Sequence, residues 1–457
     1  MNASSLAESG HVIPSVHNPH EHQRRGTTVL ESAKGVFLRD ANGNTLLDAF
    51  SGLWCVNVGY GQDSIVKVAT EQLARLPYAT NYFGFGSEPS IRLAERLIEL
   101  APKSLQRVYF GLGGSDAVDS ALRFITHYYN AIGLPGKKHI IALERGYHGS
   151  SSTGSGLTAL TSFHRNFDVP LKTQHHIPSP YPYRNAHAGD DAAIIAGSVS
   201  ALEAAVQALG RDQVAAFICE PVQGSGGVIV PPKGWLKAMR DACTRLGILF
   251  VADEVITAFG RTGPLFACEH EGVEPDIMIV AKGLTAGYAP MSAVMLSERI
   301  YQGMADGCAP GAVIGHGQTY SAHPVSAAIG LEVLRLYTEG GLLANGKARA
   351  PEFAAGLDDL LAHPLVGDSR HIGMLGALEL VTDKATKAKF DPELKLHERL
   401  FKAAYDNKIV FRAFNDDILG FAPALSYTES EMALLFERLR KTLDQVLGQA
   451  EVRRNLA

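Results

Sequence analysis

Two short apolar runs, each ending at an ionisable residue, constrain the fold of this chain more than any other feature. Gly247-Ile-Leu-Phe-Val-Ala leads to Asp253, and Asp276-Ile-Met-Ile-Val-Ala leads to Lys282. Apolar runs of about four to eight residues between polar or glycine residues are typical of buried strands in a parallel sheet. Because ligands of open α/β sheets bind outside the carboxyl ends of the strands, we expect Asp253 and Lys282 to lie at one edge of the sheet.

A carboxylate and a primary amine at one sheet edge allow three interpretations. They suit a cofactor with a basic ring nitrogen and an aldehyde, and pyridoxal phosphate is such a cofactor. They could equally form a buried ion pair, or be two unrelated charges at strand ends. Asp253 and Lys282 alone do not decide between these interpretations.

A glycine-rich turn offers a second candidate site. Gln106–Phe110 is predicted to be a strand, and Gly111-Leu-Gly-Gly-Ser115 follows it and opens a helix. We expect Ser115 to be the N-cap, and the free amides and the helix dipole to suit a phosphate. A tight turn without a ligand is the alternative. The dinucleotide-binding fingerprint fails here because Asp116 takes the place of its third glycine, which disfavours a nicotinamide-dependent oxidoreductase.

Two further predicted strands end at polar residues. Ile140–Leu143 leads to Tyr147-His148-Gly149, and Val214–Cys219 leads to Glu220. Tyr147 could stack on a flat ring, although a packed tyrosine is equally common. The segment after Gly149 lacks Gly-x-Ser-x-Gly, which disfavours a serine hydrolase. The histidine spacing matches no metal-binding motif, so we expect no metal site.

The bulk properties exclude several other classes. The net charge of −5 and the absence of a basic run disfavour nucleic acid and membrane partners. No apolar stretch is expected to reach the roughly 20 residues of a membrane-spanning helix. The N-terminal segment lacks the apolar core of a signal peptide, and the five widely spaced cysteines contain no Cys-x-x-Cys. These features predict a cytoplasmic protein with reduced cysteines.

The alternation of strands and helices predicts an α/β fold with a large, doubly wound, mostly parallel sheet. From about residue 340 the pattern changes to that of an α+β domain. We expect an N-terminal arm (1–26), a large cofactor-binding domain (66–334), and a small α+β domain built from 27–65 and 335–457. Other expected elements are a hairpin turning at Asn42-Gly43, a long loop over 164–192, and helices over 88–101, 198–210, 235–246, 324–338, 350–362, 393–406 and 428–448.

From about residue 20 to 445 the chain resembles a known family, the class III, fold-type I, pyridoxal-phosphate-dependent aminotransferases. The strongest part of the resemblance is Asp253-Glu-Val-Ile-Thr-Ala-Phe-Gly-Arg-Thr-Gly263, followed by Asp276 and Ala281-Lys-Gly283 at the spacing of the family. Other stretches match in the same order along the chain: Gly114-Ser115, Tyr147-His-Gly149, Glu220-Pro-Val-Gln-Gly224 and Thr319-Tyr-Ser-Ala-His-Pro324.

The resemblance implies the roles of the cofactor-binding residues. Lys282 would hold the cofactor as a Schiff base and shuttle a proton, and Asp253 would keep the pyridine nitrogen protonated. Tyr147 and Val255 would lie on opposite faces of the ring. Gly114 and Ser115 would bind the phosphate, together with Thr319 from the partner subunit of a homodimer or dimer of dimers. The matching stretches also place His148 and Glu220 among the cofactor-binding residues.

The resemblance also implies a substrate site. Arg412 resembles a mobile arginine that pairs with the carboxylate of the keto acid, although a surface salt bridge is the commoner use of such an arginine. Trp54, Phe83 and Phe85 correspond to an aromatic substrate pocket, while a packed core is the alternative for Trp54. The stretch Gly52-Leu-Trp-Cys-Val-Asn-Val-Gly-Tyr60 is typical of the amine:pyruvate and ω-amino-acid:pyruvate branch.

Two residues beside Asp253 bear on the branch and on specificity. Ile256 stands where ornithine- and GABA-type members usually carry glutamine, which supports the pyruvate branch. Ala258 departs from the family, which usually has glycine there. We expect these two positions to influence the substrate preference.

The leading hypothesis is an aminotransferase that moves an amino group from a primary amine or ω-amino acid to pyruvate by a ping-pong mechanism. The alternative is another pyridoxal phosphate reaction on the same scaffold, such as that of an aminomutase, racemase or decarboxylase. A catalytically silent binding protein is disfavoured because Lys282, Asp253 and Tyr147 are all present.

Overall fold

The structure, a computed structural model, describes residues 11–456. Residues 1–10 of the expected N-terminal arm therefore lie outside the described residues. The remainder of that segment contains a short helix, α2 (Pro19–Arg25), which begins at the N-cap residue Asn18. The Asn18 side chain accepts hydrogen bonds from the amides of His20 and Glu21, which is the usual way a helix start is satisfied.

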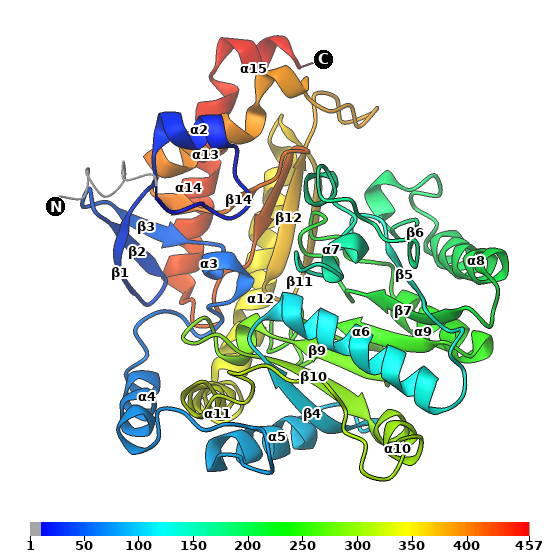
Figure 1. Cartoon of the computed structure of the whole chain (residues 1–457). Coiled ribbons are helices and arrows are strands. Elements are labelled where there is room, and N and C mark those ends of the chain that lie inside the picture. Colours follow the sequence, from blue (N-terminus) through cyan, green and yellow to red (C-terminus); the bar gives the residue numbers. More distant parts are fainter. Residues whose placement is uncertain (1–10, 457) are drawn as a thin grey trace.

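A seven-stranded sheet lies at the centre of the molecule (Figure 1). All neighbouring strands are parallel except β10, which is antiparallel to both of its neighbours, so the expected mostly parallel sheet is confirmed. In spatial order the strands are β4 (Leu105–Gly111), β10 (Ser292–Ser297), β9 (Ile277–Val280), β8 (Leu249–Asp253), β7 (Val214–Cys219), β5 (His139–Leu143) and β6 (Gln174–Ile177).

Helices cover both faces of this sheet. Successive residues of each strand point to opposite faces, so apolar strands make both faces hydrophobic. In β8, Leu249 and Val251 belong to an apolar cluster that includes residues of α6 and α10, whereas Phe250 and Ala252 join the larger core on the other face. Both faces are buried, which explains the almost uninterrupted apolar runs. The helices around the large sheet are α5 (Glu88–Leu100), α6 (Gly114–Ala131), α8 (Asp191–Leu209), α9 (Trp235–Leu246), α10 (Glu298–Asp306) and α11 (Pro324–Thr338).

Two smaller sheets form the remainder of the structure. The first has the order β1 (Leu30–Lys34), β2 (Phe37–Asp40), β3 (Thr45–Asp48) and β13 (Ile409–Val410), and the second β11 (Val366–Ile372), β12 (Leu375–Leu380), β15 (Ile418–Phe421) and β14 (Arg412–Ala413). The predicted hairpin at Asn42-Gly43 is confirmed by the β2–β3 pairing. Because β13 pairs with β3, residues 47–48 and 409–410 lie side by side; the small domain and its boundaries remain a prediction.

The helices outside the large sheet include several that the sequence predicts and others that it does not. Helices α12 (Leu342–Asp359), α13 (Leu396–Asp406) and α14 (Glu429–Leu447) correspond to expected ones, and α12 begins eight residues before the predicted start at residue 350. Helix α4 (Asp63–Arg75) and strands β1 and β11 were not predicted. The short elements are α3 (Ser51–Trp54), α7 (Gly154–Leu157) and α15 (Ala450–Arg454).

Two expectations about the chain are wrong. Residues 164–192 are not one loop, because β6 (Gln174–Ile177) pairs with β5 at the edge of the large sheet. The histidines of β6 interrupted the apolar pattern by which strands were recognised. An apolar stretch of spanning length does exist, since α8 has 19 residues and a mean hydropathy of 1.6. Its buried residues Ile194, Leu202 and Val206 share one face, as in a surface helix that packs on a protein core.

Candidate functional site

Most of the predicted site residues lie just beyond the carboxyl ends of parallel strands. Strand β4 leads to Gly114, β5 to Tyr147, β7 to Glu220, β8 ends at Asp253, and β9 leads to Lys282. Because these strands run in one direction, their carboxyl ends meet at one edge of the sheet. The sheet topology therefore gathers residues that are as many as 168 positions apart in the sequence (282 − 114).

Asp253 is a buried carboxylate paired with a buried histidine. Asp253 Oδ2 lies 2.8 Å from Nδ1 of His148, and both side chains are at most 4% exposed. The second oxygen, Oδ1, accepts the amide of Val255 at 3.2 Å. A buried carboxylate is stable when its oxygens are paired, so His148 holds Asp253 in one orientation.

The loop that carries Tyr147 and His148 is anchored by Glu220. Glu220 Oε1 accepts the amide of Tyr147, and Oε2 accepts the amide of Gly224, both at 2.9 Å. Burial raises the pKa of Glu220 to about 7, a shift that His148 opposes. Glu220 thus acts on the site through the backbone of two loops. The ring of Tyr147 packs edge-on against Phe163, with centroids 5.3 Å apart.

The start of helix α6 differs from the prediction. The N-cap is Gly113, and Ser115 lies inside the first turn. The Asp116 side chain accepts the amides of Leu112 and Gly113 at 2.9 and 2.5 Å, so the helix begins earlier than a serine cap would place it. The free amides at this helix start still suit an anion.

Two loops, one after β5 and one after β8, converge on the first turn of α6. Gly149 has φ +98, and a Cβ placed on it would lie 2.7 Å from Cα of Ser115, so only glycine allows this approach. The amide of Ser150 donates to Ser115 Oγ at 3.2 Å. A Cβ on Gly114 would lie 3.1 Å from Cγ1 of Val255. Gly114 and Ser115 therefore lie directly against Val255 and against the loop that contains Gly149.

Lys282 follows β9 with its backbone in the left-handed region, at φ 37. Within residues 11–456, no hydrogen bond or ion pair involves its Nζ. Burial lowers the pKa of this amine, and the carboxylates of Asp253 and Glu220 oppose that shift. A lowered pKa increases the fraction of neutral amine, which is the form that acts as nucleophile or base.

Trp54 and Arg412, which are both predicted to contact substrate, differ in their exposure. Trp54 is 3% exposed, and Phe50 and Ile256 belong to the same apolar cluster, so Trp54 lies close to the site but within packed core. Arg412 is exposed, and its guanidinium lies 5.3 Å from the ring centre of Phe414. Among the described residues it forms no ion pair, which leaves it available to a carboxylate.

Arg412 and Trp54 are linked through strand β15. Arg412 pairs with Gly420, and a Cβ on Gly420 would lie 2.9 Å from Trp54 Cη2 and 2.8 Å from Phe414 Cε2. Desolvation lowers the pKa of the Arg412 guanidinium although the residue is exposed, so neighbouring protein atoms surround part of the guanidinium.

Thr319, Phe83 and Phe85 are not brought into the site within one chain. Thr319 is exposed, and the two phenylalanines are 90% and 66% exposed. The Tyr78 hydroxyl donates to the carbonyl of Thr319 at 3.0 Å, so the loop before α5 lies beside the loop before α11.

The sequence interpretation missed residues that hold the site together. Thr158 Oγ1 accepts the amide of His148 and donates to the carbonyl of Gly149, both at 2.8 Å. Phe163 packs on Tyr147. A lone threonine and a lone phenylalanine carry no motif, so only their spatial neighbours reveal them.

Comparison with known proteins identifies relatives over nearly the whole chain. The family model described as aminotransferase class-III matches residues 19–443. A putrescine–pyruvate aminotransferase of Pseudomonas aeruginosa is 38% identical, with 95% of this chain and 94% of that protein covered. A diaminobutyrate–2-oxoglutarate transaminase of Halomonas elongata is also 38% identical, covering 92% and 90%. The solved ω-transaminase of Pseudomonas jessenii in complex with PMP superposes with a TM-score of 0.95 at 34% identity, covering 98% of both chains.

The raised pKa of Glu220 predicts a specific pH dependence of stability. The unfolded state ionises near pH 4.5 and the folded state near pH 7, so the contribution of Glu220 is fully present below 4.5 and is lost as the pH rises through 7. Glu220→Gln removes this titration. The difference in unfolding free energy between wild type and Glu220→Gln should change by on the order of 3 kcal/mol between pH 4.5 and 7. Denaturation midpoints across this range measure it; a difference that is independent of pH would contradict the assignment.

Proposed function

The chain belongs to the class III aminotransferase family, a pyridoxal-phosphate-dependent family of transaminases, and on that premise we propose that it moves an amino group from a primary amine or ω-amino acid to pyruvate. The observation that carries this proposal is the meeting, at one sheet edge, of a Lys282 amine that has no partner among the described residues and a buried, histidine-paired Asp253 carboxylate. The similarity to a putrescine–pyruvate aminotransferase supports pyruvate as the acceptor.

The residues present fit pyridoxal phosphate. Asp253 supplies a carboxylate for the ring nitrogen, Lys282 an amine for the aldehyde, and the helix start at Gly114 and Ser115 free amides for the phosphate. Close packing of Val255 on Gly114 and of Gly149 on Ser115 leaves no room for longer side chains at these glycines. We propose that these residues hold the cofactor, with Tyr147 and Val255 on opposite faces of its ring.

Pyridoxal phosphate, when bound, supplies an aldehyde that receives the amino group and a ring that accepts electrons from a neighbouring carbon. The chain would supply the proton chemistry. Asp253, oriented by His148, would keep a proton on the ring nitrogen, since a buried carboxylate stabilises a cation beside it. Nζ of Lys282 would take a proton from the substrate carbon and return it at the cofactor carbon, because its lowered pKa suits a general base.

We propose that Arg412 binds the carboxylate of the keto acid. Its guanidinium is accessible, unpaired among the described residues, and linked through Phe414 and Gly420 to the cluster that contains Trp54 and Ile256. A guanidinium can bind a carboxylate through two parallel hydrogen bonds. Ile256 lies against the loop after Glu220, since a Cβ on Gly224 would lie 2.4 Å from Ile256 Cδ1. Ile256 and Ala258 are both buried, but Ile256 shares its apolar cluster with Trp54, whereas Ala258 belongs to the larger core, so Ile256 is the better candidate for a pocket wall.

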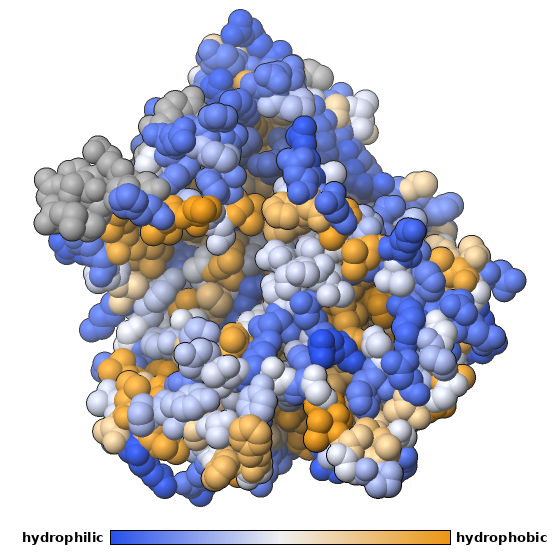
Figure 2. Space-filling model, in the orientation of Figure 1, coloured by the Kyte–Doolittle hydropathy of each residue, from blue (hydrophilic) through white to orange (hydrophobic). Residues whose placement is uncertain are grey.

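We also propose that the protein is a homodimer that completes each site with Thr319 of the second copy. Tyr78, Tyr82, Phe83, Phe85 and Tyr320 form an exposed aromatic patch, each at least 39% exposed. Figure 2 shows further hydrophobic residues over the region of α4, where Val66 and Leu73 are exposed. Such surfaces are normally covered by a partner, and aromatic side chains are enriched at the centres of interfaces. We place this dimer in the cytoplasm, since all five cysteines are free.

The proposed reaction is tested with a panel of amines. Purified holoenzyme is incubated with phenylethylamine, putrescine, β-alanine or taurine and with pyruvate, and alanine formation is measured; a parallel series uses 2-oxoglutarate. We expect alanine from at least one amine. Lys282→Ala should lose the cofactor attachment that borohydride reduction and peptide mapping detect, whereas Lys402→Ala, an exposed lysine, should keep it. Carbon dioxide release or racemisation without transfer to an acceptor would reject the aminotransferase assignment.

Arg412→Ala separates the two half-reactions. Loss of the guanidinium should weaken the half-reaction with pyruvate by about 100-fold, because a charge-assisted bidentate contact is lost. The half-reaction with an amine that lacks a carboxylate should change by less than about threefold. Single-turnover absorbance measurements follow each half-reaction separately. Equal losses in both would remove the carboxylate role of Arg412.

Mixed dimers test the contribution of Thr319. Co-expression of Lys282→Ala with Thr319→Asp should restore activity, because the hybrid dimer contains one site with an intact lysine and an intact partner threonine. Lys282→Ala with Asp253→Asn is the matched control and should restore nothing, since both residues belong to the same subunit. Absence of rescue in the first pair, or full activity of a monomer in sedimentation experiments, would contradict the shared site.

A further inference from the structure

The turn that carries Lys282 has an unusual backbone. Lys282 has φ 37, and Phe259, which packs against this turn, has φ 60. Residues other than glycine seldom occupy the left-handed region, and they remain there only where surrounding contacts hold them. The contacts that hold this turn therefore help to set the direction in which the lysine side chain leaves it.

The first contact comes from Tyr337 of helix α11. Its hydroxyl donates to the carbonyl of Gly283, directly after Lys282, at 2.7 Å. Tyr337 is fully buried, and its ring stacks on Phe259 with centroids 5.9 Å apart and planes 16° from parallel. Without this hydroxyl, the carbonyl of Gly283 would lose a buried donor.

The second contact comes from Asn57, in the loop after α3. Its Nδ2 donates to the carbonyl of Phe259 at 3.1 Å. The backbone of Gly283 lies directly against both side chains, because a Cβ placed on Gly283 would be 2.9 Å from Asn57 Nδ2 and 3.0 Å from Phe259 Cδ2. Asn57 and Phe259 thus prevent the turn from moving in their direction.

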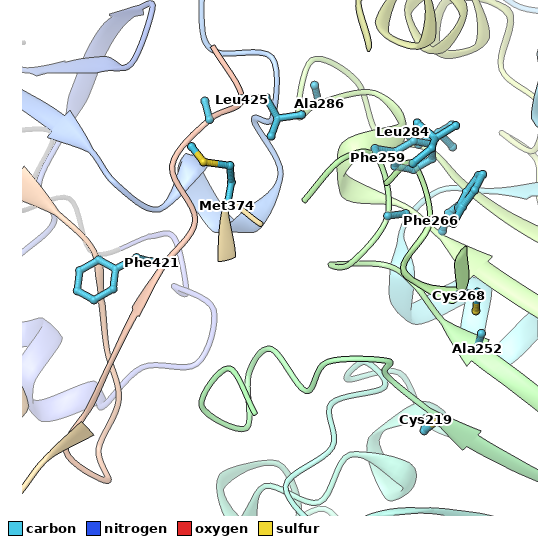
Figure 3. Close-up of a cluster of buried hydrophobic side chains, with 14 of the residues drawn as sticks. Cys219, Ala252, Phe259, Phe266, Cys268, Leu284, Ala286, Met374, Phe421 and Leu425 are labelled. Carbon is cyan, nitrogen blue, oxygen red and sulfur yellow. The ribbon is translucent and has the colours of Figure 1, made fainter. Parts of the chain in front are cut away.

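Asn57 is itself fixed by a buried arginine. Arg261 Nη2 donates to Asn57 Oδ1 at 2.6 Å, and Nη1 donates to the carbonyls of Met374 and Pro423 at 3.0 and 2.6 Å. Arg261 is fully buried among neutral acceptors, and burial lowers its pKa to about 10. Figure 3 shows Met374 and Phe259 on opposite sides of the buried cluster, and the bonds of Arg261 join the segments that contain Asn57, Met374 and Pro423.

We propose that Tyr337 and Asn57 are positioning residues for Lys282, which hold the backbone at Gly283 so that the amine points into the site. This inference rests on the proposed role of Lys282. Both residues act through the backbone of the turn and through Phe259. Arg261 contributes by keeping Asn57 in place.

Tyr337→Phe tests the inference with the smallest change, because it removes only the hydroxyl. We expect kcat to fall about tenfold with KM for the amine nearly unchanged, since a displaced base affects the chemical step more than binding. The pH midpoint of the visible absorbance of the holoenzyme should also shift. Tyr129→Phe is the matched control, because Tyr129 is buried and its hydroxyl donates to the carbonyl of Ala215 at 2.9 Å, away from the turn.

The control should lose thermal stability to a similar extent and keep both kcat and the absorbance midpoint. If Tyr337→Phe does not fold, Asn57→Ala should show the same kinetic and spectral pattern. The proposal is overturned if the variant that folds matches Tyr129→Phe in kcat and in the absorbance midpoint. Borohydride reduction and peptide mapping on the wild type keep the two proposals apart: attachment at another lysine rejects the role of Lys282, whereas attachment at Lys282 with unchanged variants rejects only the positioning.

Discussion

The site depends on a carboxylate buried where a central strand ends. Asp253 is 3% exposed at the end of β8, and an isolated charge in that position would be strongly destabilising. His148 pairs with it at 2.8 Å, and His148 is in turn held by Thr158, while Glu220 anchors the neighbouring residue Tyr147. The pairing of this buried carboxylate with His148 thus ties the loop after β5 to the end of β8.

A parallel sheet makes this arrangement possible because it presents several strand ends at one edge. The helix start at Gly114 follows β4, Asp253 ends β8 and the amine of Lys282 follows β9, so groups from separate parts of the chain meet at one edge of the sheet. Their distances from one another are therefore set by the strand spacing rather than by flexible loops. Such a rigid edge is suited to hold a cofactor by its opposite ends.

The smaller sheets contribute a second set of constraints. The loop with Trp54 and the hairpin with Arg412 come from opposite ends of the chain, and they meet at Gly420. Arg261 bonds both Asn57 and the carbonyl of Pro423, so the same region is tied to the loop that follows Asp253. Arg261 thereby connects the loop after α3 and the segment after β15 with the loop after Asp253 through buried hydrogen bonds, which are stronger than exposed ones.

The sequence alone determined the strand ends and their chemistry. Uninterrupted apolar runs before Asp253 and Lys282 predicted buried parallel strands, and the motifs around them predicted the family, because backbone pattern and reactive side chains are local properties. The start of α6, the strand β6 and the exposed positions of Phe83 and Thr319 were decided only by tertiary structure. Asp116 displaced the expected cap at Ser115, β6 became a strand by pairing with β5, and the buried environment of Trp54 arose from residues hundreds of positions away. The contacts of Tyr337 and Asn57 with Gly283 were also decided only by tertiary structure, because no local pattern in a sequence specifies which distant side chain will hold a turn.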